Sequence, residues 1–150
     1  MGIKMKKFII TSLFILFGAQ VSAQYNLHVL AEATGGHFHT ISLINAFTKT
    51  KCEYIFKGKD VKGYDVDQFI STSIRYFAPK DRMEIKQFMI KEKTKIKDTL
   101  KADFDELIKR FDGDGMDYKT GCGALMGTFS SAFIETKRFY ENAVKYHSYK

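Results

Sequence analysis

The sequence has a single proline among its 150 residues and only two cysteines. With 11 glycines besides, it has few of the turn residues that an all-β fold of many short strands requires. The two cysteines, at positions 52 and 122, form no C-x-x-C pair, which excludes a thioredoxin-like redox motif and covalent haem attachment. A content of 45% hydrophobic and 27% charged residues excludes a disordered or low-complexity chain, and the length suits one domain.

The motifs of common catalytic sites are also missing. There is no G-x-S-x-G sequence, and the glycine-rich stretch 121–127 lacks the lysine and the preceding strand of a phosphate-binding loop. Ser71, Ser130 and Ser131 lie within segments that we expect to be helical. We therefore expect a protein that is not an enzyme and that carries no cofactor.

The first 23 residues have the pattern of a cleavable signal peptide. Three lysines lie among the first seven residues, an apolar run covers residues 8–19, and small residues precede a predicted cleavage site before Gln24. The apolar run is shorter than the roughly 20 residues that span a bilayer. We expect a periplasmic or secreted protein without stable membrane insertion after cleavage.

Removing this leader lowers the formal net charge from +7 to +4, because it contains three lysines and no acidic residue. So small a charge gives little reason to expect nucleic acid as a partner. Two cysteines in an oxidising compartment favour a disulfide between Cys52 and Cys122. It would close a loop of about 70 residues, for which loop entropy gives a stabilisation of about 4 kcal/mol.

Apolar residues recur at steps of three and four in four segments of the chain, which predicts four amphipathic helices. Before them, residues 24–36 have no sustained period and are expected to form an irregular arm that ends at Gly35 and Gly36. The predicted helices cover residues 37–57, 82–111 and 118–146, and a further helix begins after a cap at Asp65 and ends before Pro79.

Three aspartates stand where helix N-caps are expected, namely Asp65, Asp81 and Asp117. Short connections between amphipathic helices predict an all-α domain over residues 37–150, an antiparallel four-helix bundle. In this topology Cys52, late in the first helix, and Cys122, early in the fourth, lie at the same end. The expected disulfide therefore fits the predicted bundle.

Small residues stand four apart in the fourth predicted helix, at Gly123, Gly127 and Ser131. This spacing lets another backbone approach closely, so we expect a close helix–helix crossing there. A ligand groove is the alternative.

Two patterns suggest metal sites. The loop from Asp112 to Asp117 resembles the start of an EF-hand, but the ligand positions that should follow hold Met116 and Gly123, so a helix stop and a cap explain it better. His37 and His39 are the candidate zinc or copper ligands. On a helix they point about 200° apart and cannot converge, whereas in an extended segment they share a side.

Two groups of residues are candidates for contacting a partner at the protein surface, one of lysines and one of tyrosines. Lys91, Lys93 and Lys95 form a basic run that either faces a partner or is a solvated helix face. Tyrosines, which are enriched at binding hot spots, are candidate anchors at positions 64, 76, 118, 140, 146 and 149.

These features predict an exported helical protein that acts by binding a macromolecule, in the manner of an envelope inhibitor or immunity-type protein. Its expected partner is another protein. The alternative is a periplasmic bundle that binds a small ligand or a metal ion, with His37 and His39 near its mouth.

Overall fold

The structure, a computed structural model, describes residues 25–150, so the predicted signal peptide over residues 1–23 and its cleavage site lie outside the described residues. Residues 25–150 contain no strand, which confirms the all-α prediction for this part of the chain. The elements are α1 (Leu27–Phe47), η1 (Glu53–Phe56), η2 (Lys62–Tyr64), α2 (Val66–Ser73), η3 (Ile74–Tyr76), α3 (Pro79–Gly113) and α4 (Tyr118–His147), where η marks a 3-10 turn.

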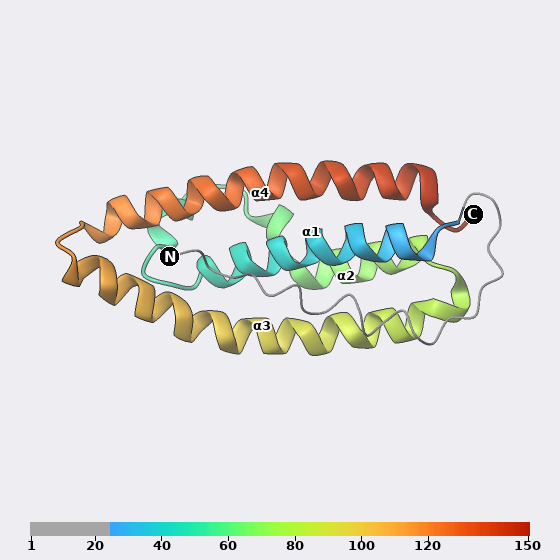
Figure 1. The fold of residues 1–150 in the computed structure, drawn as a ribbon, viewed down its shortest axis with the longest axis horizontal. Helices are drawn as coiled ribbons and strands as arrows, with labels where there is room; N and C mark the ends of the chain where they lie inside the picture. Colours follow the sequence, from blue (N-terminus) through green and yellow to red (C-terminus); the bar gives the residue numbers. More distant parts are fainter. Residues whose placement is uncertain (1–24) are drawn as a thin grey trace.

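Helix α1 is the centre of the molecule. It lies between α3 and α4 and also contacts α2, while α3 and α4 are joined by a short turn at the left of the view (Figure 1). The four helices alternate in direction along the chain (Figure 1). However, α2 has 8 residues against 21, 35 and 30 in the other three, so it covers only part of the space beside α1 and α4.

The expected irregular arm over residues 24–36 is wrong, because α1 begins at Leu27. Its N-cap is Asn26, whose side chain accepts a hydrogen bond from the Val29 amide at 3.2 Å. The first three turns bury small residues such as Ala33 and Thr34 beside Leu30, and these hide the helical period in the sequence.

Helix α1 also ends earlier than expected, at Phe47 instead of residue 57. The Thr50 hydroxyl donates to the Phe47 carbonyl at 2.8 Å and accepts from the Cys52 amide at 3.1 Å. Such local bonds from a threonine side chain compete with the helical pattern. The apolar residues that follow reach the core from the η1 turn, where Phe56 is buried.

Two of the three predicted caps are confirmed. The Asp65 carboxylate accepts from the Gln68 amide at 2.9 Å at the start of α2, and Asp117 accepts from the Lys119 amide at 3.2 Å at the start of α4. The prediction for Asp81 is wrong. Helix α3 begins at Pro79, whose fixed φ suits a first helical position, and Asp81 is buried in the first turn, accepting from the Tyr25 hydroxyl at 2.9 Å.

The two ends of α4 are attached to the rest of the chain. The predicted disulfide between Cys52 and Cys122 is confirmed, with a Cα–Cα distance of 5.6 Å. At the opposite end, the Asn26 amide donates to the His147 carbonyl at 3.2 Å, and the Tyr149 amide donates to the Tyr76 carbonyl at 2.8 Å. Both attachments hold α4 against elements far away in the sequence.

The expected helix crossing at Gly123, Gly127 and Ser131 is wrong, because all three are exposed and a Cβ on either glycine would meet nothing within 4 Å. The glycine that does have a close neighbour is Gly121. A Cβ there would lie 2.5 Å from Cδ2 of Phe111, near the turn between α3 and α4.

Over residues 25–150, no helix combines the length and the apolar character that crossing a membrane requires.

Candidate functional site: a groove beside the short helix

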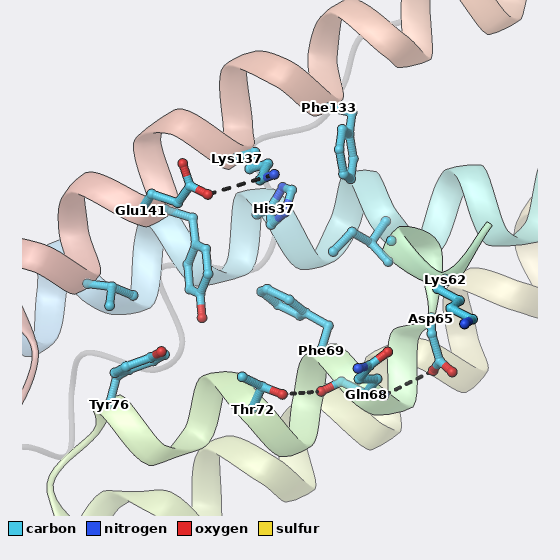
Figure 2. A pocket seen from close by; sticks show the side chains of 14 residues that line it. His37, Lys62, Asp65, Gln68, Phe69, Thr72, Tyr76, Phe133, Lys137 and Glu141 are labelled. Atoms are coloured by element: carbon cyan, nitrogen blue, oxygen red, sulfur yellow. Dashed lines mark hydrogen bonds and ion pairs between the residues drawn. The ribbon is translucent and has the colours of Figure 1, made fainter. Parts of the chain in front are cut away.

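A groove of about 540 Å³ opens between α2 and α4, with one side of α1 as its floor (Figure 2). It lies where the short α2 faces the second half of the much longer α4. Aromatic and aliphatic side chains line its interior, while charged and polar side chains from α2, the segment before it, and α4 form its rim. The lining residues are His37, Ile41, Lys62, Gly63, Asp65, Gln68, Phe69, Thr72, Tyr76, Phe133, Lys137, Tyr140, Glu141 and Val144.

Four rings from three helices pack together in this groove. The His37 ring of α1 lies 5.3 Å from Phe69 of α2, and 5.1 Å and 5.6 Å from Phe133 and Tyr140 of α4, measured between ring centroids. The rings of Phe69 and Tyr140 are 5.1 Å apart. Edge-to-face and offset arrangements at these distances are the favourable geometries for aromatic pairs. These four rings form one side of the groove, which we call the aromatic wall.

His37 is the buried polar group of this wall, with 4% of its surface exposed. Burial, with the positive charge of Lys137 as a second cause, lowers the pKa of His37 from 6.5 to about 4, so the ring is neutral at physiological pH. Its Nδ1 lies 3.0 Å from the Thr136 hydroxyl. We assign the tautomer from the network: the Thr136 hydroxyl donates to the Phe133 carbonyl at 3.4 Å and so accepts from Nδ1–H of His37, which leaves Nε2 as an acceptor.

Tyr140 also keeps its neutral form. Burial, followed by the electrostatic effects of Tyr76 and Glu141, raises the pKa of the Tyr140 phenol above its usual value of 10. No formal charge therefore lies on the aromatic wall at physiological pH.

The charges of the rim balance each other. Lys137 and Glu141, one turn apart on α4, form an ion pair with an N–O distance of 3.8 Å (Figure 2). Lys62 and Asp65 stand at the α2 side, where Asp65 is occupied with the Gln68 amide. Two lysines and two acids give this lining no formal net charge.

The structure does not bring the histidines together as a metal site. His37 faces α4, whereas His39 lies on another side of α1, where the charge of Glu92 on α3 partly offsets the lowering of its pKa by burial. His28 lies 3.9 Å from Glu32 on the same helix, and His147 ends α4. Within residues 25–150, no three His, Cys, Asp or Glu side chains are grouped as metal ligands would be.

The lysine run lies on α3, away from the groove lining. Lys93 contacts both carboxylate oxygens of Asp67 at 2.6 Å, and Lys95 lies 3.9 Å from Glu92. Lys91 is exposed. Two of the three candidate lysines are thus paired with acidic residues of this chain, which favours the solvated-face alternative for those two.

Sequence reasoning named part of the groove without placing it. Tyr76 and Tyr140 were among the candidate anchors, and His37 was a candidate metal ligand. Phe69 lies within the second predicted helix, and Phe133 and Thr136 within the fourth, but no motif distinguishes these three residues. No sequence pattern indicates that these residues meet in the fold, because His37 and Thr136 are 99 residues apart in the chain.

Comparisons with known proteins give no match to a family model, a curated protein or a solved structure.

Proposed function

We propose that this is an exported binding protein whose groove between α2 and α4 takes a small, uncharged and largely apolar ligand. The observation that carries this proposal is the groove itself, with its wall of neutral aromatic rings and its balanced rim. The proposal favours the small-ligand alternative of the sequence analysis, without the metal ion.

The size and chemistry of the groove support a small ligand. Sites for small molecules are concave, usually 300–1,000 Å³ in volume, and mostly apolar with a few placed polar groups. A groove of about 540 Å³ lies in this range. Helix bundles place such sites between their helices, and we interpret this fold as an antiparallel four-helix bundle with one short member.

Export is part of the proposal. The Cys52–Cys122 disulfide is of the kind that persists in oxidising compartments. Together with the leader pattern of residues 1–23, it supports a periplasmic or secreted location.

The inhibitor hypothesis stays a prediction with one favourable feature. On α4, Ile134 and Phe139 are 69% and 63% exposed, and large exposed apolar side chains suit a protein partner. If these two side chains contact a protein partner, Ile134→Ser combined with Phe139→Ser abolishes recovery of that partner from envelope extract. Recovery of no partner by the wild-type protein would refute the hypothesis.

A pair of neighbouring substitutions tests the groove. Thr72 lines the groove and its neighbour Ser71 does not, although both are exposed and the hydroxyls of both donate to the same Gln68 carbonyl. Thr72→Trp should fill part of the groove, while Ser71→Trp adds the same side chain on α2 without lining it. The probe is N-phenyl-1-naphthylamine, a neutral aromatic dye whose fluorescence rises in apolar sites.

We expect saturable binding of the dye by the wild-type protein and by Ser71→Trp, and at least tenfold weaker binding by Thr72→Trp. Equal weakening in both variants would place the dye elsewhere. No saturable binding by the wild-type protein would also overturn the proposal.

A further inference from the structure

His37 gives the aromatic wall of the groove a hydrogen-bond acceptor whose orientation is set by Thr136. We infer that the groove selects an uncharged aromatic ring that carries a hydrogen-bond donor, such as a phenol or an indole, and that this donor binds Nε2 of His37. The inference rests on the proposed function and specifies the ligand class for that same groove.

The geometry assigns the two ring nitrogens of His37 to different tasks. Nδ1 is held by the Thr136 hydroxyl of α4 at 3.0 Å. Thr136 is the hydrogen-bond partner of the His37 ring among residues 25–150, so Nε2 has no protein donor there. Figure 2 shows His37 on α1 beside Lys137 of α4, with Phe69 on the α2 side of it, and His37 is among the residues that line the groove. Because Nδ1 is held and His37 lines the groove, we infer that Nε2 is the ring atom that binds the ligand.

The wall favours a flat ring. Phe69, Phe133 and Tyr140 surround His37 with centroid distances between 5.1 and 5.6 Å. Each of these rings can accept another aromatic ring edge-on or offset, the two arrangements that aromatic groups prefer. Because the rings come from three different helices, a planar ligand can contact several of them at once.

The ion pair of α4 disfavours a charged ligand beside the aromatic wall. Lys137 is paired with Glu141, so an anion would compete with Glu141 and a cation would compete with Lys137. Neither charge would find an unpaired opposite charge inside the aromatic wall, and a buried unpaired charge is costly.

A hydrogen-bond donor on the ligand raises the affinity, because it gives Nε2 of His37 a hydrogen bond in the bound state. Without a ligand, water can reach this acceptor through the open groove. A ring without a donor displaces that water and leaves the acceptor unsatisfied, which is unfavourable, whereas a phenol replaces the bond. We expect a preference of about tenfold for the ring with the donor.

Thr136 is a positioning residue in this scheme. Its oxygen accepts from Nδ1–H and so keeps the lone pair on Nε2. Thr136→Val conserves the side-chain volume and removes that acceptor. Thr128 is the matched control, because it is exposed on the same helix and its hydroxyl donates to the Ala124 carbonyl of its own turn.

The test compares 2-naphthol with 2-methoxynaphthalene, which share a ring system but differ in the donor. Affinities are measured by displacement of the naphthylamine dye from the oxidised, full-length protein. The wild-type protein and Thr128→Val should prefer 2-naphthol about tenfold. His37→Phe should bind both compounds equally, with the affinity for the ether retained, and Thr136→Val should reduce the preference.

The outcomes separate the two proposals. If neither compound displaces the dye and the dye itself does not bind, the proposed function fails. If both compounds bind the wild-type protein equally, the inference fails while the proposed function stands. A preference that persists in His37→Phe would also overturn it. Circular dichroism checks that each variant is folded, and Thr136→Val keeps the test decisive if His37→Phe does not fold.

Discussion

Acidification should destabilise this protein through His37, and His37→Phe should remove that part of its acid sensitivity. The ring is buried and neutral in the folded protein, with its pKa lowered from 6.5 to about 4. In the unfolded chain the same ring takes up a proton at its ordinary pKa. Between these two values the unfolded state binds more protons, so the free energy of unfolding rises with pH.

The size of the effect follows from the pKa difference. Each pKa unit corresponds to about 1.4 kcal/mol, so a shift from 6.5 to about 4 corresponds to roughly 3 kcal/mol. This contribution is fully present above pH 6.5 and is lost as the pH falls toward 4.

The assay is urea unfolding of the oxidised wild-type protein and of His37→Phe, at pH 7 and at pH 4. The other titrating groups, including His39 and the carboxylates, are present in both proteins and cancel in the comparison. We expect the wild-type protein to lose about 3 kcal/mol more than the variant between the two pH values. Equal losses would refute the assignment of His37 as a buried neutral ring, and its NMR titration gives a direct check.

Two further predictions concern the packing around α4. Gly123→Ala should stabilise the protein by about 1 kcal/mol, because the site is open and helical. Gly121→Ala must displace the Phe111 ring, so this variant should be less stable than Gly123→Ala by roughly 1–3 kcal/mol. Urea unfolding measures both variants, and equal stabilisation would contradict the close contact at Gly121. Replacing Cys52 and Cys122 together by serine should lower the free energy of unfolding by about 4 kcal/mol, and a loss below about 1 kcal/mol would show that the bridge does not restrain the unfolded chain.

The parts of the fold that the sequence predicted are those set by local chemistry. The caps at Asp65 and Asp117 depend on bonds within three residues, and both form. The pairing of Cys52 with Cys122 followed from there being only two cysteines. Long apolar periodicity likewise placed α3 and α4 nearly correctly.

The errors have a common physical cause, because tertiary contacts overrode the local pattern. Helix α1 is buried on several sides, so its inner positions include Thr34, Thr40 and Ser42 as well as apolar residues, and its period is obscured. Beyond Phe47 the apolar period continues, but the Thr50 hydroxyl stabilises a different turn.

The candidate site was less predictable than the fold. Each of its residues had a plausible local assignment, and none was assigned to a shared groove. His37 was considered as a metal ligand because of its neighbour His39, yet its partner is Thr136 on α4. The groove runs alongside α2 and the η3 turn, and the end of α2 at Ser73, before the predicted end near Pro79, had no capping pattern in the sequence to indicate it.

The attachment of α4 at both ends explains how such a groove can stay open. Apolar walls facing water would be more stable if α4 moved toward α2 and closed the space. The Cys52–Cys122 disulfide fixes the beginning of α4, and the bond from the Tyr149 amide to the Tyr76 carbonyl fixes the chain just beyond its end. Tyr76 itself lines the groove, so this second attachment sets the distance between its two walls. Between two fixed ends a continuous helix resists bending, and the aromatic wall stays available to a ligand instead of being lost to collapse.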